Sequence, residues 1–336
     1  MFPPFLHSLR IFITDDSVFQ ITGVFSLPVK FHLPDFTRKF YLNLMLKKLI
    51  EREPDAFYDG VTVGSMYGEF PSSIFNGGRC RGGMFPEKDI RYVISELAKE
   101  GISLRYTYTN PLITEKHLSD AHCNNCLRLA QREDRTNAVI LTSPLLEEYV
   151  RRKYPNYRIV SSTCKQITDF DRLCEELEKY DWVVLDYNLN NNWELLEKLP
   201  HKERCELLVN AVCTPACPRR KAHYEFLARI QIDYVEHLKK YGPNAPYTQK
   251  ERFPCPYAEN MIYDTTEYST HIRPQDIYEK YVPMGFENFK IEGRSNNLFN
   301  VMETYLYYMV KPEHRDEMRL NYLLSLQKTG VISVND

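Results

Sequence analysis

The sequence predicts an α/β fold, a (β/α)8 TIM-like barrel with a long insertion between its seventh and eighth strands. Three observations predict it: short apolar runs of strand length recur along the chain, segments of helical period separate them, and eight such units are present. Strict alternation of buried strands and amphipathic helices is typical of parallel strands joined by helical crossovers, and eight units close a barrel. An open doubly wound sheet is the alternative.

The predicted strands are short apolar runs bounded by turn residues. The run Trp-Val-Val-Leu-Asp at 182–186 is representative, because its apolar residues are followed by a polar residue at the carboxyl end. In chain order the runs span 29–33, 58–64, 103–109, 137–143, 157–163, 182–186, 206–210 and 287–293.

The segments between these runs carry apolar residues at helical spacing. They span 40–53, 87–100, 144–154, 169–180, 192–199, 219–241 and, after the last strand, 297–310. Because no other repeat or low-complexity tract is visible, we expect residues 1–336 to form a single barrel domain.

One connection is unusually long. The seventh and eighth strands begin 81 residues apart, at Glu206 and Glu287, and the helix between them ends near Tyr241. The remainder is rich in Pro, Tyr and polar residues, and long irregular loops in compact domains usually carry function. We expect residues 242–286 to form an insertion over the barrel mouth.

Composition narrows the function class. A formal net charge of -2 provides no overall field for nucleic acid or a membrane, so an anionic partner would need a local basic patch. The first residues lack the continuous apolar core of a signal peptide, and no run reaches membrane-spanning length. The 9 cysteines fit a reducing compartment with thiols kept for a metal or for chemistry. We therefore expect a cytoplasmic protein with no membrane partner.

Cysteines gather where a barrel carries its chemistry. Cys213 and Cys217 follow the seventh strand and precede a proline suited to the first turn of a helix, where the positive helix end favours thiolate over thiol. Cys255 lies in the insertion and strengthens the case for a metal. A fourth thiol would come from Cys126, beyond the third strand, or from Cys164, after the fifth. The alternative is that these are small apolar packing residues, as we expect for Cys174 and Cys205.

Further polar residues end the predicted strands. Glu292 and Arg294 are separated by one residue, so strand alternation sends both side chains to one face, where they could bind each other or a ligand. Asn110, Asp186 and Asn210 likewise end their strands with polar atoms facing the predicted pocket. We predict catalytic roles for Glu292, Arg294 and Asn110, and substrate binding by Asn210 and Asp186.

Cations occupy the first turn of the helix after Cys217. Arg219 and Arg220 are disfavoured there by the helix dipole, which indicates an anionic partner such as a carboxylate, a phosphate or an RNA backbone, although a solvated charge run is the alternative. We predict that both arginines bind substrate. The glycine-rich loop at 64–83 could act as a lid or cradle a phosphate, but it lacks nucleotide-binding motifs.

Specific motifs resemble those of the collagenase-like peptidase family U thirty-two. They are Ala-Val-Cys ending at Cys213, the following Cys217, the late Cys255, and the run Lys-Ile-Glu-Gly-Arg at 290–294. The resemblance implies a (β/α)8-like domain and, in several members, an oxygen-labile 4Fe–4S cluster held by four cysteines. Some members are called peptidases, and others are needed for oxygen-independent hydroxylation of ubiquinone precursors or RNA bases. The three-residue gap between Cys213 and Cys217 departs from the family signature and matches a sister pattern in the hydroxylation group.

Two classes of function follow. The first is an iron–sulfur enzyme, with Cys213, Cys217, Cys255 and Cys126 as ligands, that modifies a small or RNA-borne anionic substrate by oxygen-independent hydroxylation or a related redox-linked reaction. The second is a barrel with a structural zinc or no metal that acts as a binding module for a protein partner. A peptidase-like hydrolase is a further alternative, although no hydrolase motif is present.

Overall fold

Eight parallel strands form a closed barrel in chain order in this computed structural model, which describes residues 27–79, 82–255, 262–294 and 297–333. Strand β8 pairs with both β7 and β1, which closes the sheet. The predicted barrel is therefore confirmed, and the open doubly wound sheet is excluded. The strands are β1 (Val29–Pro34), β2 (Val61–Gly68), β3 (Ser103–Tyr108), β4 (Ala138–Leu141), β5 (Arg158–Ser161), β6 (Trp182–Val184), β7 (Cys205–Leu208) and β8 (Asn288–Lys290).

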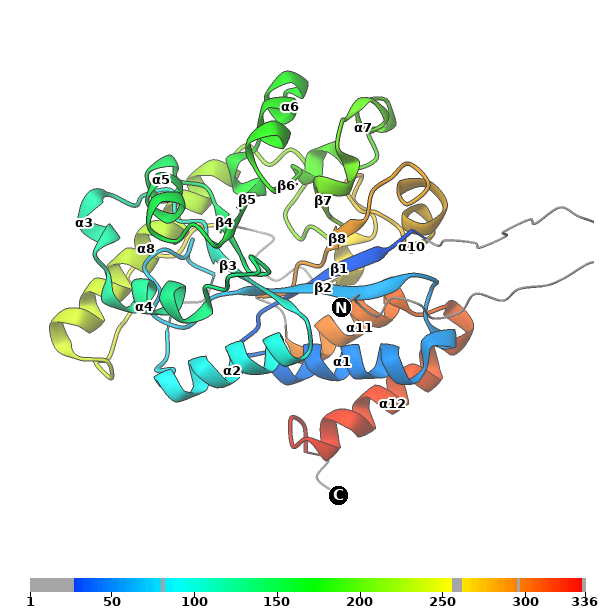
Figure 1. Cartoon of the computed structure of the whole chain (residues 1–336), viewed down its shortest axis with the longest axis horizontal. Coiled ribbons are helices and arrows are strands. Elements are labelled where there is room, and N and C mark those ends of the chain that lie inside the picture. The colour runs from blue at the N-terminus through cyan, green and yellow to red at the C-terminus, as the bar shows by residue number, and fades with distance from the viewer. Residues whose placement is uncertain (1–26, 80–81, 256–261, 295–296, 334–336) are drawn as a thin grey trace, which may run out of the picture.

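Helices surround the barrel, as Figure 1 shows. All seven predicted helical segments are present, and Ser143 and Asp169 cap two of them with side-chain oxygens. The helices are α1 (Phe40–Arg52), α2 (Glu87–Lys99), α3 (Glu115–Leu118), α4 (Ala121–Ala130), α5 (Pro144–Lys153), α6 (Phe170–Lys179), α7 (Trp193–Lys198), α8 (Arg220–Tyr241), α9 (Ile262–Thr265), α10 (Pro274–Asp276), α11 (Leu298–Met309) and α12 (Arg315–Lys328). None of the helices in the described residues has the length and apolar character needed to cross a bilayer.

Helices α1, α11 and α12 lie together on the β1–β2 side of the barrel (Figure 1). The Tyr322 hydroxyl of α12 donates to the Leu42 carbonyl of α1 at 2.6 Å, and the Tyr305 hydroxyl of α11 donates to Asn43 at 2.6 Å. Both tyrosines are fully buried, so their hydroxyls satisfy polar groups that burial would otherwise leave without partners.

Sequence analysis missed α4. The Asp120 carboxylate caps this helix by accepting from the Cys123 backbone N–H at 2.7 Å. Its buried residues recur at helical spacing, at Cys123, Cys126, Leu127 and Ala130, so the pattern is visible only if cysteine is counted as apolar. Cys126 therefore lies inside a packed helix and not in a rim loop.

Two strand boundaries differ from prediction in ways that affect the site. Strand β2 is shifted towards the carboxyl end, because a register shift between Phe31 and His32 extends its pairing with β1 to Tyr67. Strand β8 ends at Lys290, so the regular alternation expected for Glu292 and Arg294 does not reach them.

The barrel interior contains a buried charge cluster. The Glu206 carboxylate accepts from Arg105 at 2.5 Å and from Lys290 at 2.6 Å, and His32 lies 3.6 Å from it. Burial opposes ionisation of Glu206, but the nearby charges, led by Lys290, hold its pKa well below the usual range. Burial lowers the pKa of His32 to about 3, so this imidazole is neutral at pH 7. The core of the barrel therefore depends on one carboxylate that balances two cations.

The described parts of the insertion return to the barrel. Phe253 stacks on His223 of α8 with ring centroids 4.4 Å apart, and the Pro254 carbonyl accepts from Arg219 at 2.7 Å. On the other side, the Ile272 N–H donates to the Val209 carbonyl just after β7 at 3.1 Å. These contacts bring Cys255 to the first turns of α8, while the extent of coverage over the mouth stays a prediction.

Candidate functional site

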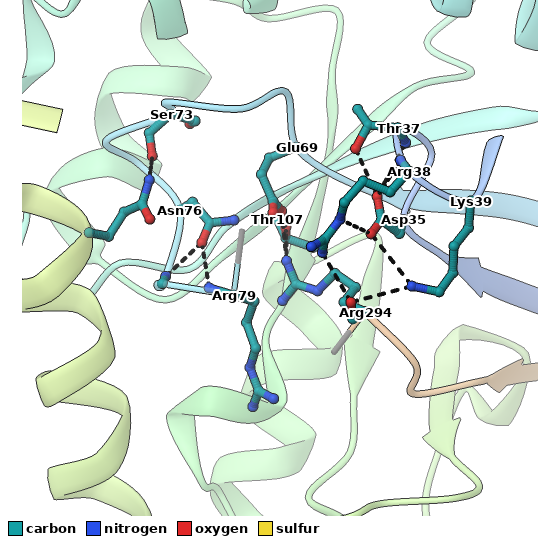
Figure 2. Close-up of polar contacts among 12 residues, drawn as sticks. Asp35, Thr37, Arg38, Lys39, Glu69, Ser73, Asn76, Arg79, Thr107 and Arg294 are labelled. Atoms are coloured by element: carbon teal, nitrogen blue, oxygen red, sulfur yellow. Dashed lines mark hydrogen bonds and ion pairs between the residues drawn. The ribbon is translucent and has the colours of Figure 1, made fainter. Parts of the chain in front are cut away.

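The carboxyl ends of β2, β3 and β8 converge on an ion pair. Arg294 Nη1 lies 2.6 Å from Glu69 Oε2 and 2.7 Å from Thr107 Oγ1, and the Thr107 hydroxyl donates to Glu69 (Figure 2). Burial raises the pKa of Glu69, although Arg294 opposes this shift. This end of a parallel barrel is where active sites occur, so the triad is a candidate site for proton transfer or ligand binding.

Arg294 is held at its backbone as well. Its carbonyl accepts from Arg38 Nη2 at 3.0 Å and from Lys39 Nζ at 3.4 Å, and Asp35 accepts from Arg38 Nε at 2.8 Å. Figure 2 shows these groups on the loop after β1, beside the Glu69 triad. Sequence analysis identified Arg294 but missed Glu69, which follows Gly68 directly after the observed end of β2.

Of the two alternatives for Glu292 and Arg294, binding to each other is not what the structure shows. Glu292 Oε1 instead accepts from Arg79 Nη1 at 3.1 Å, and its Oε2 accepts from the Val212 backbone N–H at 3.1 Å. Alternation fails because β8 ends before these residues. Glu292 therefore ties the glycine-rich loop to the segment that carries Cys213.

Asn210 extends the pairing of β7 with β8. Its side-chain NH2 donates to the Glu292 carbonyl at 2.9 Å, and its Oδ1 accepts from the Glu292 N–H at 2.6 Å. The Asn210 side chain thus makes the hydrogen bonds that a strand backbone would make, at the point where the pairing of β7 with β8 ends. Because both polar ends of the amide bind backbone, Asn210 positions the cysteine loop and does not fit the substrate-binding role predicted for it.

The predicted substrate residues Asp186 and Arg220 bind each other. Arg220 Nη1 lies 2.6 Å from Asp186 Oδ2, its Nη2 donates to the Thr163 carbonyl at 3.1 Å, and its Nε donates to the Tyr224 hydroxyl at 2.9 Å. The pair is buried, and the guanidinium lies 4.0 Å from the centre of the Tyr187 ring. Arg220 thus anchors the start of α8, and neither partner has its charge available for a ligand.

Arg219 is also engaged. In addition to the Pro254 carbonyl, its guanidinium lies 4.7 Å from the centre of the Phe253 ring. It therefore holds the returning insertion against α8 at the position that brings Cys255 close. The cations predicted from the helix start are occupied within the protein, so an anion would need other partners.

Two of the predicted metal ligands are brought together. Cys213 and Cys217 are close enough for their charges to interact, and Cys213 lies beside the Tyr187 hydroxyl. Burial raises the pKa of Cys213, and the Tyr187 hydroxyl and Arg220 act in the opposite direction. Cys217 lies two residues before the N-cap of α8, Arg219, and this helix N-terminus has no side-chain cap and no acidic residue in its first turn. Such a helix end favours thiolate over thiol.

The other thiols are placed differently. Cys164 follows β5 and is in electrostatic contact with Arg79 and Tyr224, which are also close to the mouth. Cys126 is buried in the core beside Tyr106, whose hydroxyl donates to the Cys126 carbonyl at 2.9 Å. The position of Cys126 on α4 therefore does not fit the predicted set of ligands, whereas Cys164 and Cys255 do lie near the start of α8.

The donor set is incomplete as it stands. Within the ranges that the structure describes, no three His, Cys, Asp or Glu side chains are grouped closely enough to hold a metal ion. Cys80 falls outside those ranges. A four-cysteine cluster would thus require Cys164 and Cys255 to approach the Cys213–Cys217 pair.

The glycine-rich loop is firmly packed. Asn76 Oδ1 accepts from the Gly78 and Arg79 N–H groups at 2.6 and 3.0 Å, and Gln231 Nε2 donates to the Ser73 carbonyl at 2.8 Å (Figure 2). Asn110 donates to the Ile74 and Ala228 carbonyls, and its Oδ1 accepts from the Leu112 N–H. The catalytic role predicted for Asn110 does not fit these contacts, because it joins the loop to α8.

Gly78 is the tightest point of this loop. Its φ is +89°, and a Cβ there would lie 2.2 Å from the Leu227 carbonyl oxygen. We expect Gly78→Ala to lower the free energy of unfolding by about 1–3 kcal/mol more than Gly101→Ala does, measured by urea denaturation. Gly101 is the matched control, since its φ is +67° but a Cβ there would meet no atom within 4 Å. Equal losses in the two variants would show that the loop is not packed against α8.

The structure is a (β/α)8 barrel with buried ion pairs. Cys213 and Cys217 lie at the carboxyl ends of its strands, where barrel enzymes carry their active sites. No family model matches the sequence. Over 165 residues the chain is 27% identical to the uncharacterized protease MJ1657 of Methanocaldococcus jannaschii, a match that spans 48% of this chain and 45% of that protein. The fold is also similar to the solved structure of the U32 peptidase Mk0906, with a TM-score of 0.48 and 13% sequence identity. This match covers 82% of the present chain and 98% of the Mk0906 chain. The chain therefore spans less than half the length of the protease that it matches.

Proposed function

We propose that this chain is a barrel enzyme that holds an iron–sulfur cluster at its mouth and modifies an anionic substrate in a redox-linked reaction. The observation that carries the proposal is the position of Cys213 and Cys217, which precede the uncapped start of α8 and are close enough for their charges to interact. Two thiols at a positive helix end are suited to binding a metal as thiolates. The motif resemblance to members with oxygen-labile clusters adds support.

The proposed ligands are Cys213, Cys217, Cys255 and Cys164. Cys164 replaces Cys126 in this set because it lies on the rim near Tyr224, whereas Cys126 is buried in α4. A bound cluster would provide one-electron transfer chemistry: hydroxylation by water removes two electrons and two protons from the substrate, and the electrons would pass through the cluster to an external electron acceptor. Oxygen-independent hydroxylation is the finer form of this proposal.

Residues of the Glu69 triad would handle protons and orient the substrate. The Glu69 carboxyl can hold a proton at the barrel mouth, since burial raises its pKa. Arg294 and Thr107 fix this carboxyl by hydrogen bonds, and Arg294 is in turn fixed through its carbonyl by Arg38. A rigidly held carboxyl at the barrel mouth can take up or release a proton as electrons leave the substrate.

Peptide hydrolysis is the second candidate. The printed names of the two similar proteins, a protease and a peptidase, favour it. Glu69 could then act as a general acid, with its proton next to Arg294. Release of labelled peptide from gelatin by protein free of iron would favour this candidate.

The test of the proposed function is the metal content of protein purified without oxygen. We expect brown protein that contains iron and acid-labile sulfide in equal amounts, as the composition of a 4Fe–4S cluster requires. Colourless protein that contains zinc, or no metal, would contradict the iron–sulfur proposal and favour a binding module.

A further inference from the structure

A side cavity of about 550 Å³ opens beside the mouth. It lies between the carboxyl ends of β3, β4 and β5, helices α5 and α6, and the first turns of α8. Cys164 and Tyr224 line it and also lie beside Arg79 or Arg220 of the mouth. A ligand in the cavity would therefore be adjacent to the proposed cluster.

Two carboxylates of the side cavity, Glu147 and Glu176, already have cationic partners. Glu176 accepts from Lys165 at 2.8 Å, and Glu147 pairs with Lys179 at 3.1 Å and accepts from the Tyr180 hydroxyl. Lys165 also donates to the Tyr180 hydroxyl at 2.7 Å. An ammonium group has three N–H donors, so Lys165 retains one for a ligand.

Two cations at the rim of the side cavity have no such partners. Arg172 of α6 and Lys221 of α8 both line it, and neither side chain forms an ion pair or hydrogen bond within the described part of the chain. They contrast with Arg219 and Arg220, which are engaged in the protein. The uncapped start of α8 adds a positive field on the same side.

Other residues that line the side cavity can bind the hydroxyl groups and the ring of a sugar. Glu225 lines the side cavity and forms no ion pair with any described residue, and the buried Thr142 hydroxyl has no hydrogen-bond partner among them. Both can bind ligand hydroxyl groups. The Tyr224 ring and Pro111 provide apolar surface against which a sugar ring can pack.

We propose that the side cavity binds a sugar phosphate, with the phosphate held by Lys165, Arg172 and Lys221 and the sugar hydroxyls bound by Glu225 and Thr142. Three cationic side chains match the three terminal oxygens of a phosphate monoester, whereas a carboxylate has only two. The proposal rests on the proposed function only in treating the bound molecule as the anionic substrate, since the cavity itself does not depend on a metal.

Calorimetric titration with glucose 6-phosphate at low salt tests the proposed sugar phosphate site. Glucose and inorganic phosphate, the two components of this ligand, are titrated separately for comparison. We expect glucose 6-phosphate to bind more tightly than either part. The double variant Arg172→Ala with Lys221→Ala should weaken binding at least about tenfold, because it removes two charge-assisted hydrogen bonds. The control double variant, Arg152→Ala with Lys240→Ala, removes exposed cations of α5 and α8 that do not line the cavity and should change binding by less than about twofold.

Three results would overturn the proposal: no saturable binding of glucose 6-phosphate up to about 10 mM, equal affinity in both double variants, or binding of inorganic phosphate alone as tightly as the ester. Iron and sulfide are measured in the same samples. Iron-free protein that still binds glucose 6-phosphate would contradict the cluster but support the side cavity, and iron-loaded protein that does not bind it would do the reverse.

Discussion

Replacing Glu206 by Gln is expected to lower the free energy of unfolding by about 3–5 kcal/mol, because it removes one partner of a buried ion cluster. The variant leaves Arg105 and Lys290 without the carboxylate that binds both, in a barrel interior where Glu206 is fully buried. Glutamine has nearly the same size and shape as glutamate, so the loss of stability reflects the missing charge and not a change in packing. Urea denaturation at pH 7 measures it.

The pH dependence of the stability of the Glu206→Gln variant shows whether the loss comes from the unpaired charge of Lys290. Without Glu206, Lys290 should give up its proton more readily, since burial already lowers its pKa. The unfolded chain then binds more protons than the folded one, so the stability of the Glu206→Gln variant should rise with pH towards the ordinary lysine pKa of about 10.4. The deficit relative to the wild type should shrink accordingly.

Two further variants control this prediction. Glu203→Gln changes an exposed carboxylate just before β7 and should alter stability by no more than about 0.5 kcal/mol. The double variant Glu206→Gln with Lys290→Gln should recover part of the loss, because only Arg105 then lacks a counter-charge. A double variant less stable than the single one would show that the cluster is not held by charge balance.

Replacing Cys217 by Ser is expected to abolish iron binding, and Cys213→Ser should do the same. These thiols are the pair that the structure brings together at the start of α8, and an alkoxide-forming serine is a poor substitute for a thiolate ligand. Iron and acid-labile sulfide per chain in protein prepared without oxygen measure the effect, which should be a fall to the background level.

Cys126→Ala and Cys174→Ser are the matched controls. Cys126 is buried in α4, and Cys174 lies on α6, so neither should hold metal, and both variants should retain the iron of the wild type. Loss of iron in Cys126→Ala without loss of folding would restore the ligand set expected from sequence. Retention of iron in Cys217→Ser would remove the proposed site.

The fold could be predicted because hydrophobic periodicity is local. Residues 182–185 are all apolar, and the segment at 169–180 has one apolar face, so each indicates its own secondary structure. Helix α4 was not predicted because its core positions include Cys126, which was interpreted as a metal ligand. A residue type with two common uses gives no local signal to distinguish them.

The site was less predictable because its contacts join residues far apart in the chain. Glu292 was expected to face Arg294, but the end of β8 at Lys290 frees it to bind Arg79, 213 residues away in the chain. Likewise, the cationic start of α8 was interpreted as a site for an anionic substrate, but Arg220 pairs with Asp186 of the same chain. Only the three-dimensional structure shows which of these cations have partners and that Lys221 has none among the described residues.

The most direct measurement of the central claim is anomalous diffraction at the iron absorption edge from crystals grown without oxygen. We predict iron at the barrel mouth, with the Sγ atoms of Cys213 and Cys217 each about 2.3 Å from an iron atom, the usual metal–thiolate distance. We also predict that Cys164 and Cys255, rather than Cys126, complete the ligand set. Iron bound elsewhere, or a mouth in which Cys213 and Cys217 bind no iron, would contradict this account.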